Sequence, residues 1–347
     1  MDQPTPARRA RVTDVARLAG VHASTVSRAL SPATRHMVSA EVVARVLAAA
    51  ERLAYQPDAI AASLRSGRSH TVGVVLPDIT NPVFPLILGG IEEALDARGY
   101  VPIVANAGGQ ASRADPARQC VVVERLLAHQ VDGLILATAS RHDAAIGTIV
   151  ARGIPLVLVN RADDEGRVPA VVSDDSRGMA LAVDHLVALG HRRLAHLAGP
   201  ATLSTGWQRR AGFLAAAAAH GLDTPAIMEA DAYGREAGRL AAERLLDEAP
   251  GVTAIVAAND LLALGCLDAL RGRGRTCPED LSLVGHNDMP FMDAIAPPLT
   301  TVRIRHREMG TEAARLLLRA IAGEANGLSI VLRPDLIVRG STRAVTS

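Results

Sequence analysis

The sequence predicts an all-α head that contains a helix-turn-helix, followed by an α/β core of two similar lobes, each with a parallel sheet. Two patterns support this fold class. Up to residue 53, apolar residues recur at helical spacing in short segments, whereas from residue 71 short apolar runs alternate with longer helical stretches. A chain of 347 residues that is 49% hydrophobic is long enough for two or three domains with sizeable cores.

Charge separates the head from the core in the same way. Residues 1–70 contain ten arginines and five acidic residues, a net charge of +5, whereas the whole chain carries +1. A basic head on a mildly acidic body is typical of a protein in which the head alone binds a polyanion.

The helix-turn-helix is predicted from TDVARLAGVHASTVSRAL, residues 13–30. Thr13 is the expected N-cap of the first helix, and Gly20 is its expected stop. A second helix follows over residues 23–30, and a third from Ser39 to Leu53 can close a three-helix head. The residues expected to face the core of the head are Val15, Ala16, Leu18, Ala19, Val26, Ala29, Leu30, Val42, Val43, Val46, Leu47 and Ala50.

The outward residues of the second helix suit contact with DNA. Ala23, Ser24 and Thr25 are small enough to let its first turn enter the major groove, and Arg28, one turn later, can contact a guanine edge or a phosphate. Helix pairs with a glycine turn also occur in many proteins that do not bind DNA, so the pattern alone leaves both interpretations open.

Residues 58–70 are expected to form a hinge. Asp58 can cap a short helix, nearly all alanine around Leu64, that is too short to be stable alone. If two copies meet over DNA, Leu64 can act as an apolar wedge in the minor groove while Arg65 and Arg68 hold phosphates. The alternative is a flexible linker, which the RSGRS composition also allows.

The rest of the chain predicts two α/β lobes. Apolar runs such as TVGVVLP and DGLILAT alternate with helical stretches such as RGMALAVDHLVALG, which indicates βαβ units with buried parallel sheets. There are too many units for one sheet of usual size, so a ligand is expected between two lobes, at the carboxyl ends of the strands. Those ends carry Asp78, Asn81, Phe84, Asn160, Arg161, Asn259, Asp260, His286, Asn287 and Asp288.

Several functional classes have no motif. The three cysteines lack CxxC spacing, and no stretch fits a dinucleotide or P-loop fingerprint, so no metal or cofactor is expected. No apolar run reaches the roughly 18 residues of a membrane helix and no secretory signal is present, which predicts a cytoplasmic protein without a membrane partner. An exported solute-binding protein or an α/β enzyme remains as the alternative, although an enzyme would need a catalytic constellation.

These motifs together resemble the lac repressor/galactose repressor (LacI/GalR) family of bacterial transcription regulators. The resemblance rests on residues 13–30 and on AASLRSGRSHTVGVVLPDITNPVF, VDGLILA, HLVALGHRRLAHLAGP, AANDLLALG and PPLTTVR, and it covers residues 11–343. It implies a transcription regulator that binds a near-palindromic operator in double-stranded DNA as a homodimer or higher oligomer. A repressor is expected rather than an activator, because a dimer bound to an operator blocks the polymerase without further contacts. A small effector in the interlobe cleft would change the affinity for DNA.

The resemblance also implies the domain limits. The DNA-binding domain would span 11–57 and the hinge helix and linker 58–70. The core at 71–343 would be similar to periplasmic sugar-binding proteins. Its N-lobe would comprise about 71–171 and 303–328, and its C-lobe about 172–302 and 329–343.

Site residues follow by matching positions to the family motifs. Ala23, Ser24 and Arg28 would contact base edges, with Thr25 and Ser27 holding phosphates or supporting the helix. The implied DNA-contacting set is Thr13, Ala23, Ser24, Thr25, Ser27, Arg28, Leu64 and Arg65. The implied effector-binding set is Asp78, Asn81, Phe84, Arg209, Tyr233, Asn259, Asp260 and Asn287.

Several core assignments have a structural alternative. Arg209 matches an arginine that holds ligand oxygens, and its fork of donors suits that role. Asp78 and Asn81 could instead cap the next helix, Phe84 could belong to the core, and Asp260 could be structural. The position of Trp207, in the cleft wall or at an interface, is left open.

Three residues depart from the family pattern. His22 stands where a serine usually caps the recognition helix, so the start of that helix is in doubt. Asn287 replaces a carboxylate that often accepts from ligand hydroxyls, and His286 adds a group expected to titrate near neutrality. Because a negative charge is lost beside Arg209, the sequence suggests an anionic effector such as a sugar acid or another small carboxylate.

Overall fold

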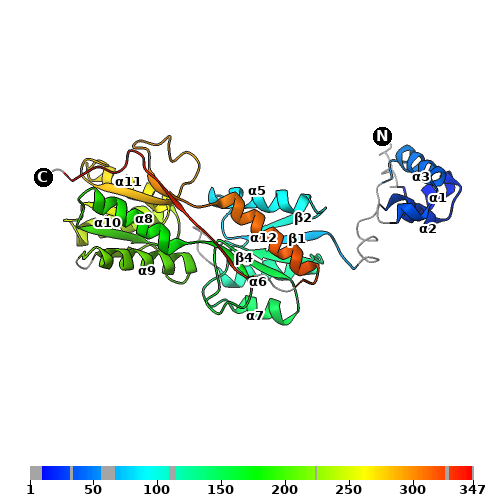
Figure 1. Cartoon of the computed structure of the whole chain (residues 1–347), viewed down its shortest axis with the longest axis horizontal. Coiled ribbons are helices and arrows are strands. Elements are labelled where there is room, and N and C mark those ends of the chain that lie inside the picture. Colours follow the sequence, from blue (N-terminus) through cyan, green and yellow to red (C-terminus); the bar gives the residue numbers. More distant parts are fainter. Residues whose placement is uncertain are drawn as a thin grey trace, which may run out of the picture. The chain divides into compact units, whose positions relative to one another are not determined.

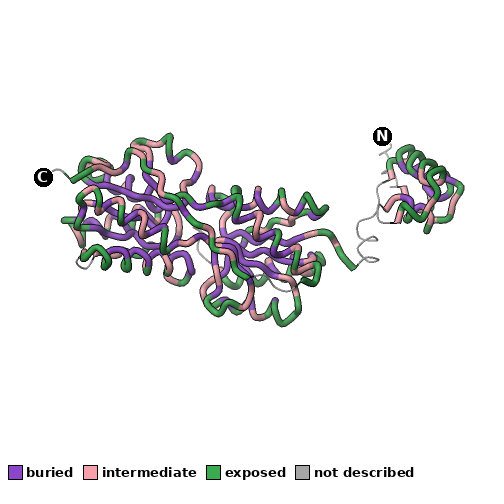
Figure 2. The backbone as a smooth tube through the Cα atoms, in the orientation of Figure 1, coloured by how far each residue is buried: buried purple, intermediate pink, exposed green. Residues whose placement is uncertain are grey.

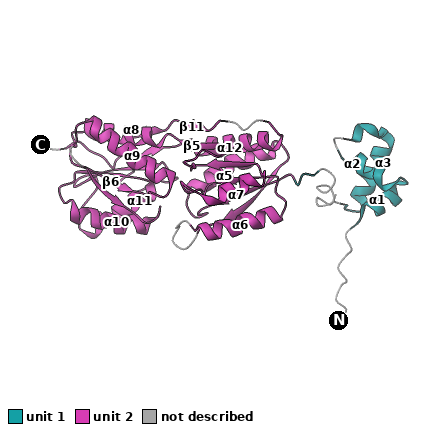
Figure 3. Ribbon diagram, turned by 90° about the horizontal axis from the view of Figure 1, so that it is seen from below, with its two compact units in different colours: residues 1–69 teal, residues 70–347 magenta. Residues whose placement is uncertain are grey.

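The computed structural model describes residues 10–31, 34–55, 67–108, 115–222, 225–324 and 328–345. The chain divides into two compact units, residues 1–69 and 70–347 (Figure 3). The predicted hinge residues Leu64 and Arg65 lie outside the described residues, so their role stays a prediction.

The head is a three-helix unit in which α1 and α2 form the helix-turn-helix. Val15, Val26 and Val46, one from each α-helix, are fully buried at its centre because each helix places an apolar stripe toward the other two. The elements are α1 (Val12–Ala19), α2 (Ala23–Leu30), the 3₁₀ turn η1 (Arg35–Met37) and α3 (Ala40–Arg52).

Three predictions for the head are wrong in detail. Thr13 is the second residue of α1 rather than its cap, because the helix begins at Val12, two residues earlier than predicted. Arg11 is the N-cap, and its backbone N–H donates to Asp14 over 2.9 Å. Leu18 is 42% exposed and Leu47 41% exposed. Each lies about 100° around its helix from the centre of the buried stripe, which is too far to reach the core.

The core unit contains two six-stranded sheets. The first has the order β11-β5-β4-β3-β1-β2 and is parallel throughout. The second has the order β12-β10-β9-β8-β6-β7, with only the β10–β12 pair antiparallel. The strands are β1 (Thr71–Leu76), β2 (Val101–Asn106), β3 (Gly133–Leu136), β4 (Leu156–Val159), β5 (Ala170–Ser173), β6 (Leu194–Ala198), β7 (Ala226–Glu229), β8 (Ala254–Ala257), β9 (Ser282–Asn287), β10 (Thr300–Arg303), β11 (Ile330–Leu332) and β12 (Asp335–Ile337).

Helices cover both faces of each sheet, so the central strands are buried on both sides (Figures 1 and 2). In the first lobe α5 and α12 pack together on one face, and α6 and α7 bury their apolar residues on the other. In the second lobe α8 pairs with α9, and α10 pairs with α11. The helices are α5 (Val83–Asp96), α6 (Pro116–Ala128), α7 (Ala144–Ala151), α8 (Asp175–Ala188), α9 (Ser204–Ala219), α10 (Arg235–Glu248), α11 (Asp260–Gly272) and α12 (His306–Ile321).

The chain passes between the lobes three times, after β5, after β10 and after β11. The predicted N-lobe limit at residue 171 is too early because β5 runs to Ser173. The predicted C-lobe segment 329–343 is also wrong at its start, because β11 pairs with β5 in the first sheet. Only the last part of that segment, beginning with β12, joins the second sheet.

Two glycines let α5 and α12 approach closely. A Cβ at Gly90 would collide with the backbone carbonyl of Arg307, and a Cβ at Gly310 would collide with that of Ile87. At the neighbouring Gly89 the nearest atom would be 3.9 Å away. Gly90 and Gly310 are therefore required for helix packing in the first lobe, whereas Gly89 is not.

Candidate ligand cleft and DNA-contacting helix

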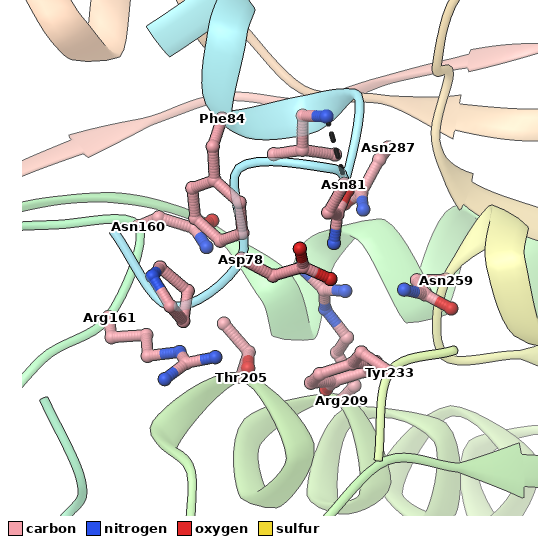
Figure 4. Close-up of a pocket in the computed structure, with 12 residues that line it drawn as sticks. Asp78, Asn81, Phe84, Asn160, Arg161, Thr205, Arg209, Tyr233, Asn259 and Asn287 are labelled. Carbon is pink, nitrogen blue, oxygen red and sulfur yellow. Dashed lines mark hydrogen bonds between the residues drawn. The ribbon is translucent and has the colours of Figure 1, made fainter. Parts of the chain in front are cut away.

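A cavity opens between the lobes at the carboxyl ends of β1, β4, β8 and β9. It contains about 450 Å³ of empty space, a figure that includes the part open to solvent. Figure 4 shows polar side chains that converge on it from both lobes. Its walls are Pro77, Asp78, Asn81, Val83, Phe84, Asn160, Arg161, Thr205, Arg209, Tyr233, Asn259 and Asn287.

Most of the residues expected to bind an effector line this cavity. Asp260 does not. The seven that do are Asp78, Asn81, Phe84, Arg209, Tyr233, Asn259 and Asn287.

The loop after β1 is held by its own side chains. Asp78 Oδ1 accepts from the backbone N–H and the hydroxyl of Thr80, at 2.9 and 2.7 Å, and Asn81 Oδ1 accepts from the backbone N–H of Val83 at 3.2 Å. Asn81 therefore orders the start of α5 and also lines the cavity. Phe84 likewise belongs to the hydrophobic core at 3% exposure and lines the cavity.

Arg209 is held in place by two hydrogen bonds to groups that do not line the cavity. Its Nε donates to Asp175 Oδ1 over 2.9 Å and its Nη1 donates to the Ala258 carbonyl over 2.6 Å. Burial lowers the pKa of Arg209, but the adjacent Asp175 carboxylate outweighs it, so the pKa lies above its ordinary value. Its guanidinium carbon also lies 5.9 Å from the ring centroid of Tyr233, within cation–π range.

Arg161 is a second buried guanidinium in the cavity wall, and it has no acidic partner. It is 6% exposed, its Nη1 donates to the Thr138 carbonyl over 3.2 Å, and no carboxylate of the described residues lies within ion-pair distance. Its Nε is buried without a hydrogen bond. Burial lowers the pKa of Arg161 to about 10, so the group still carries its charge at neutral pH.

Asn160, Arg161 and Thr205 also line the cavity, although they are not in the effector-binding set that the resemblance implies. Asn160 and Arg161 follow β4 directly, and the strand-end rule had already placed them at the correct edge. Thr205 lies four residues before Arg209 on α9, so the helical period puts both on one face. This four-residue spacing could have predicted from the sequence that Thr205 lies in the site.

Asp260 lies behind the cleft wall. It is fully buried, and its carboxylate accepts from the Thr301 hydroxyl over 2.6 Å and from the Met289 N–H over 2.8 Å. Its neighbour Asn259 is the N-cap of α11 and faces the cavity, whereas Asp260 is the first helical residue and points elsewhere. Burial raises the pKa of Asp260 to about 7. Its expected position in the cleft is therefore wrong, and its role is structural.

His286 does not titrate near neutrality. Asn287, at the end of β9, lines the cavity, whereas His286 is fully buried behind it, with Nδ1 3.1 Å from Asn287 Oδ1 and Nε2 3.6 Å from Asp175 Oδ1. Burial holds the pKa of His286 well below its ordinary value, with a further contribution from Arg209. A Cβ at Gly178 would lie 2.8 Å from His286 Nε2, so a glycine is needed there.

Beside the cavity, a few polar groups of the two lobes contact each other and form an interlobe edge. The backbone N–H of Arg141 donates to the Thr202 carbonyl over 3.0 Å, and that of Ala162 donates to the Ser204 hydroxyl over 2.9 Å. The Arg141 guanidinium lies 4.1 Å from the ring centroid of Trp207, which is 47% exposed. Trp207 does not line the cavity, so it belongs to this interlobe edge rather than to the cleft wall.

In the head, α2 presents the predicted residues at its start. Ser24 and Arg28 are exposed, and Ala23, Thr25 and Ser27 are partly exposed. His22 is the N-cap, and its Nδ1 accepts from the backbone N–H of Ser24 over 3.3 Å. The histidine therefore replaces the usual serine as an effective cap, which removes the doubt about where the helix begins.

Within the described part of the chain, no helix is long and apolar enough to cross a bilayer. The same residues contain no group of three or more His, Cys, Asp or Glu side chains placed to hold a metal ion.

Two regions match known protein families. Residues 11–58 match the bacterial regulatory proteins of the lacI family, and residues 183–342 match the periplasmic binding protein-like domain. The HTH-type transcriptional regulator MalR of Streptomyces coelicolor is 34% identical over 343 residues, which covers 96% of each chain.

Solved structures give the same picture. The lac repressor dimer bound to operator and the anti-inducer ONPF is 28% identical with a TM-score of 0.86, and the match covers 97% of this chain and 100% of that one. The complex of the transcriptional regulator CelR with cellobiose is 31% identical with a TM-score of 0.72, and the match covers 96% of this chain and 100% of the other.

Proposed function

This chain belongs to the LacI family of bacterial regulatory proteins and is a DNA-binding transcription regulator rather than an enzyme, and from that premise we propose that it represses its target genes. It binds a near-palindromic operator as a homodimer, and a small effector in the interlobe cavity changes its affinity for that operator. Repression needs no contact beyond the DNA, because a dimer clamped on an operator blocks the polymerase.

The proposal rests on the presence, in one chain, of an exposed recognition helix and a polar interlobe cavity. The first turn of α2 is small and polar, as entry into the major groove requires, and Arg28 follows on the exposed side. The relative solved on an operator is a dimer, which supports a homodimer here.

The mechanism follows from linkage between the two sites. The cavity is lined by residues of both lobes, so a ligand held by Asp78 on one side and Arg209 on the other favours one interlobe arrangement. It shifts that equilibrium only by its differential affinity for the two arrangements. We expect the interlobe hydrogen bonds of Arg141 and Ala162 to change in the same transition, because they join the two lobes beside the cavity.

The charges in the cavity favour an effector that combines hydroxyl groups with one negative charge. Asp78, Asn81 and Asn259 suit hydroxyls, and the relative solved with cellobiose binds a sugar. Asp175 already neutralises Arg209, whereas none of the described carboxylates lies within ion-pair distance of Arg161. A buried cation without a partner is costly, and a ligand carboxylate would offset that cost. A sugar acid or related carboxylate is therefore the proposed class.

Calorimetry with matched ligands tests this class. Glucuronate and galacturonate differ from glucose and galactose mainly in a carboxylate, so the full-length protein should bind members of the acidic set more tightly. Arg161→Gln should remove that preference, whereas Arg177→Gln, on an exposed residue outside the cavity, should keep it. Binding of the neutral sugars alone would contradict an anionic effector while leaving the regulator assignment intact.

Genomic occupancy tests the operator. Chromatin immunoprecipitation and sequencing of the bound fragments should give a few sharp peaks that share a palindrome, and the neighbouring genes would indicate which metabolites to test. Peaks without a two-fold motif would contradict binding as a symmetric dimer. Higher expression of the adjacent genes after deletion of the regulator is expected for a repressor, and lower expression would point to an activator.

A further inference from the structure

His22 does more than cap α2, because it also engages the side chain of a residue expected to read DNA. Its Nδ1 lies 2.8 Å from Ser24 Oγ and 3.3 Å from Ser24 N. Both residues are exposed at the start of the helix.

The backbone contact, in which Nδ1 accepts from the Ser24 amide, indicates the direction of the side-chain hydrogen bond. Since the Ser24 amide donates to Nδ1, that nitrogen carries no proton, and the ring proton is on Nε2. An unprotonated nitrogen can only accept, so the Ser24 hydroxyl must donate its single proton to His22. The outward side of Ser24 Oγ is then left with lone pairs only.

We infer that His22 makes Ser24 an obligate hydrogen-bond acceptor in the major groove. Ser24 therefore reads an exocyclic amino group, either N6 of adenine or N4 of cytosine, because these are the donors that base edges present there. Guanine N7 and O6 and thymine O4 are acceptors and cannot pair with it. A serine is ordinarily ambiguous because its hydroxyl can rotate to donate or accept, and His22 removes that ambiguity.

This inference rests on the proposed function, since it needs an operator against which the recognition helix is placed. The first experiment is therefore selection of sites from randomised duplexes by the full-length protein, followed by the same selection with Ser24→Ala. The base pair whose preference weakens in the variant is the one that Ser24 faces. Failure of the wild-type protein to select any site would refute operator binding itself, which is a separate result.

Base analogues at that pair then test the direction of the bond. Replacing adenine with purine, or cytosine with 2-pyrimidinone, removes the amino group and should weaken wild-type binding by about fivefold, the usual effect of one hydrogen bond. The same analogue should have no such effect on Ser24→Ala. Replacing the purine of the pair with its 7-deaza analogue removes an acceptor and should leave both proteins alike. A wild-type loss with the 7-deaza analogue, and none with the amino deletion, would overturn the inference.

The variant His22→Gly tests whether His22 orients the Ser24 hydroxyl or only caps α2. Glycine is a tolerated N-cap, so α2 should persist, and the circular dichroism of the variant checks this. Without Nδ1 the Ser24 hydroxyl is free to rotate, so the fivefold dependence on the amino group should fall and a dependence on the purine N7 should appear. An unchanged dependence on the amino group in a folded His22→Gly protein would show that His22 is only a cap.

Discussion

Replacing Asp260 with asparagine should change how the stability of the core depends on pH. Asp260 is fully buried, and burial raises its pKa from 3.8 to about 7. Between these values the unfolded chain has lost the proton while the folded chain keeps it, so stability falls as pH rises. At 1.36 kcal/mol for each pKa unit, the free energy of unfolding lost across the window is about 4 kcal/mol.

The variant lacks this titration, so its stability relative to wild type should rise from about pH 4 to about pH 7 and then level off. Urea unfolding at a series of pH values measures the difference, with the fluorescence of Trp207, the only tryptophan in the chain, as the signal. Asp293→Asn, an exposed carboxylate in the loop after β9, should show no such trend. A difference between Asp260→Asn and wild type that stays constant with pH would refute the reasoning.

Three further outcomes are expected from the packing and charges of the core. Gly90→Ala should lower the free energy of unfolding by about 3 kcal/mol or more, because a backbone carbonyl occupies the position of the added methyl group. Gly89→Ala should be neutral or slightly stabilising, because its methyl group would have space. Thermal unfolding of the two variants measures the difference. Asp175→Asn should lower the free energy of unfolding by about 3–5 kcal/mol because it leaves the buried Arg209 without its counter-ion, and a loss below about 1 kcal/mol would contradict that account. Burial lowers the pKa of His196 to about 4, so this neutral histidine should cost stability as pH falls from 6.5 to that value, and His196→Asn should remove about 3 kcal/mol of acid sensitivity in urea titrations.

Sequence patterns predicted the architecture because they depend on local periodicity. The helix-turn-helix, the alternating strands and helices and the polar strand ends all follow from apolar spacing and turn residues. Five of the seven expected effector residues that line the cavity follow strand ends, which meet at one edge of a parallel sheet, whereas Arg209 and Tyr233 were expected from the family motifs alone.

The sequence-based predictions failed at residues whose role depends on the direction of the side chain rather than on position in the sequence. Asn259 and Asp260 are adjacent, but a cap and the first helical residue point in different directions. His286 and Asn287 are adjacent at the end of β9 and their side chains lie 3.1 Å apart, but only Asn287 lines the cavity. The contact of Trp207 with Arg141 joins two lobes that local spacing does not relate, so it could not be predicted.

The threefold passage of the chain between the lobes governs the order in which the molecule can be completed on the ribosome. The strands of the first lobe emerge early, but α12, which covers one of its faces, and β11, which closes its edge, are synthesised only after most of the second lobe. In the nascent chain, the first lobe therefore exposes apolar surface until α12 and β11 have been synthesised. A chain terminated before α12 would lack the packing partner of α5 and should be recognised by chaperones or proteases, even though its head and all of its cleft residues had been made.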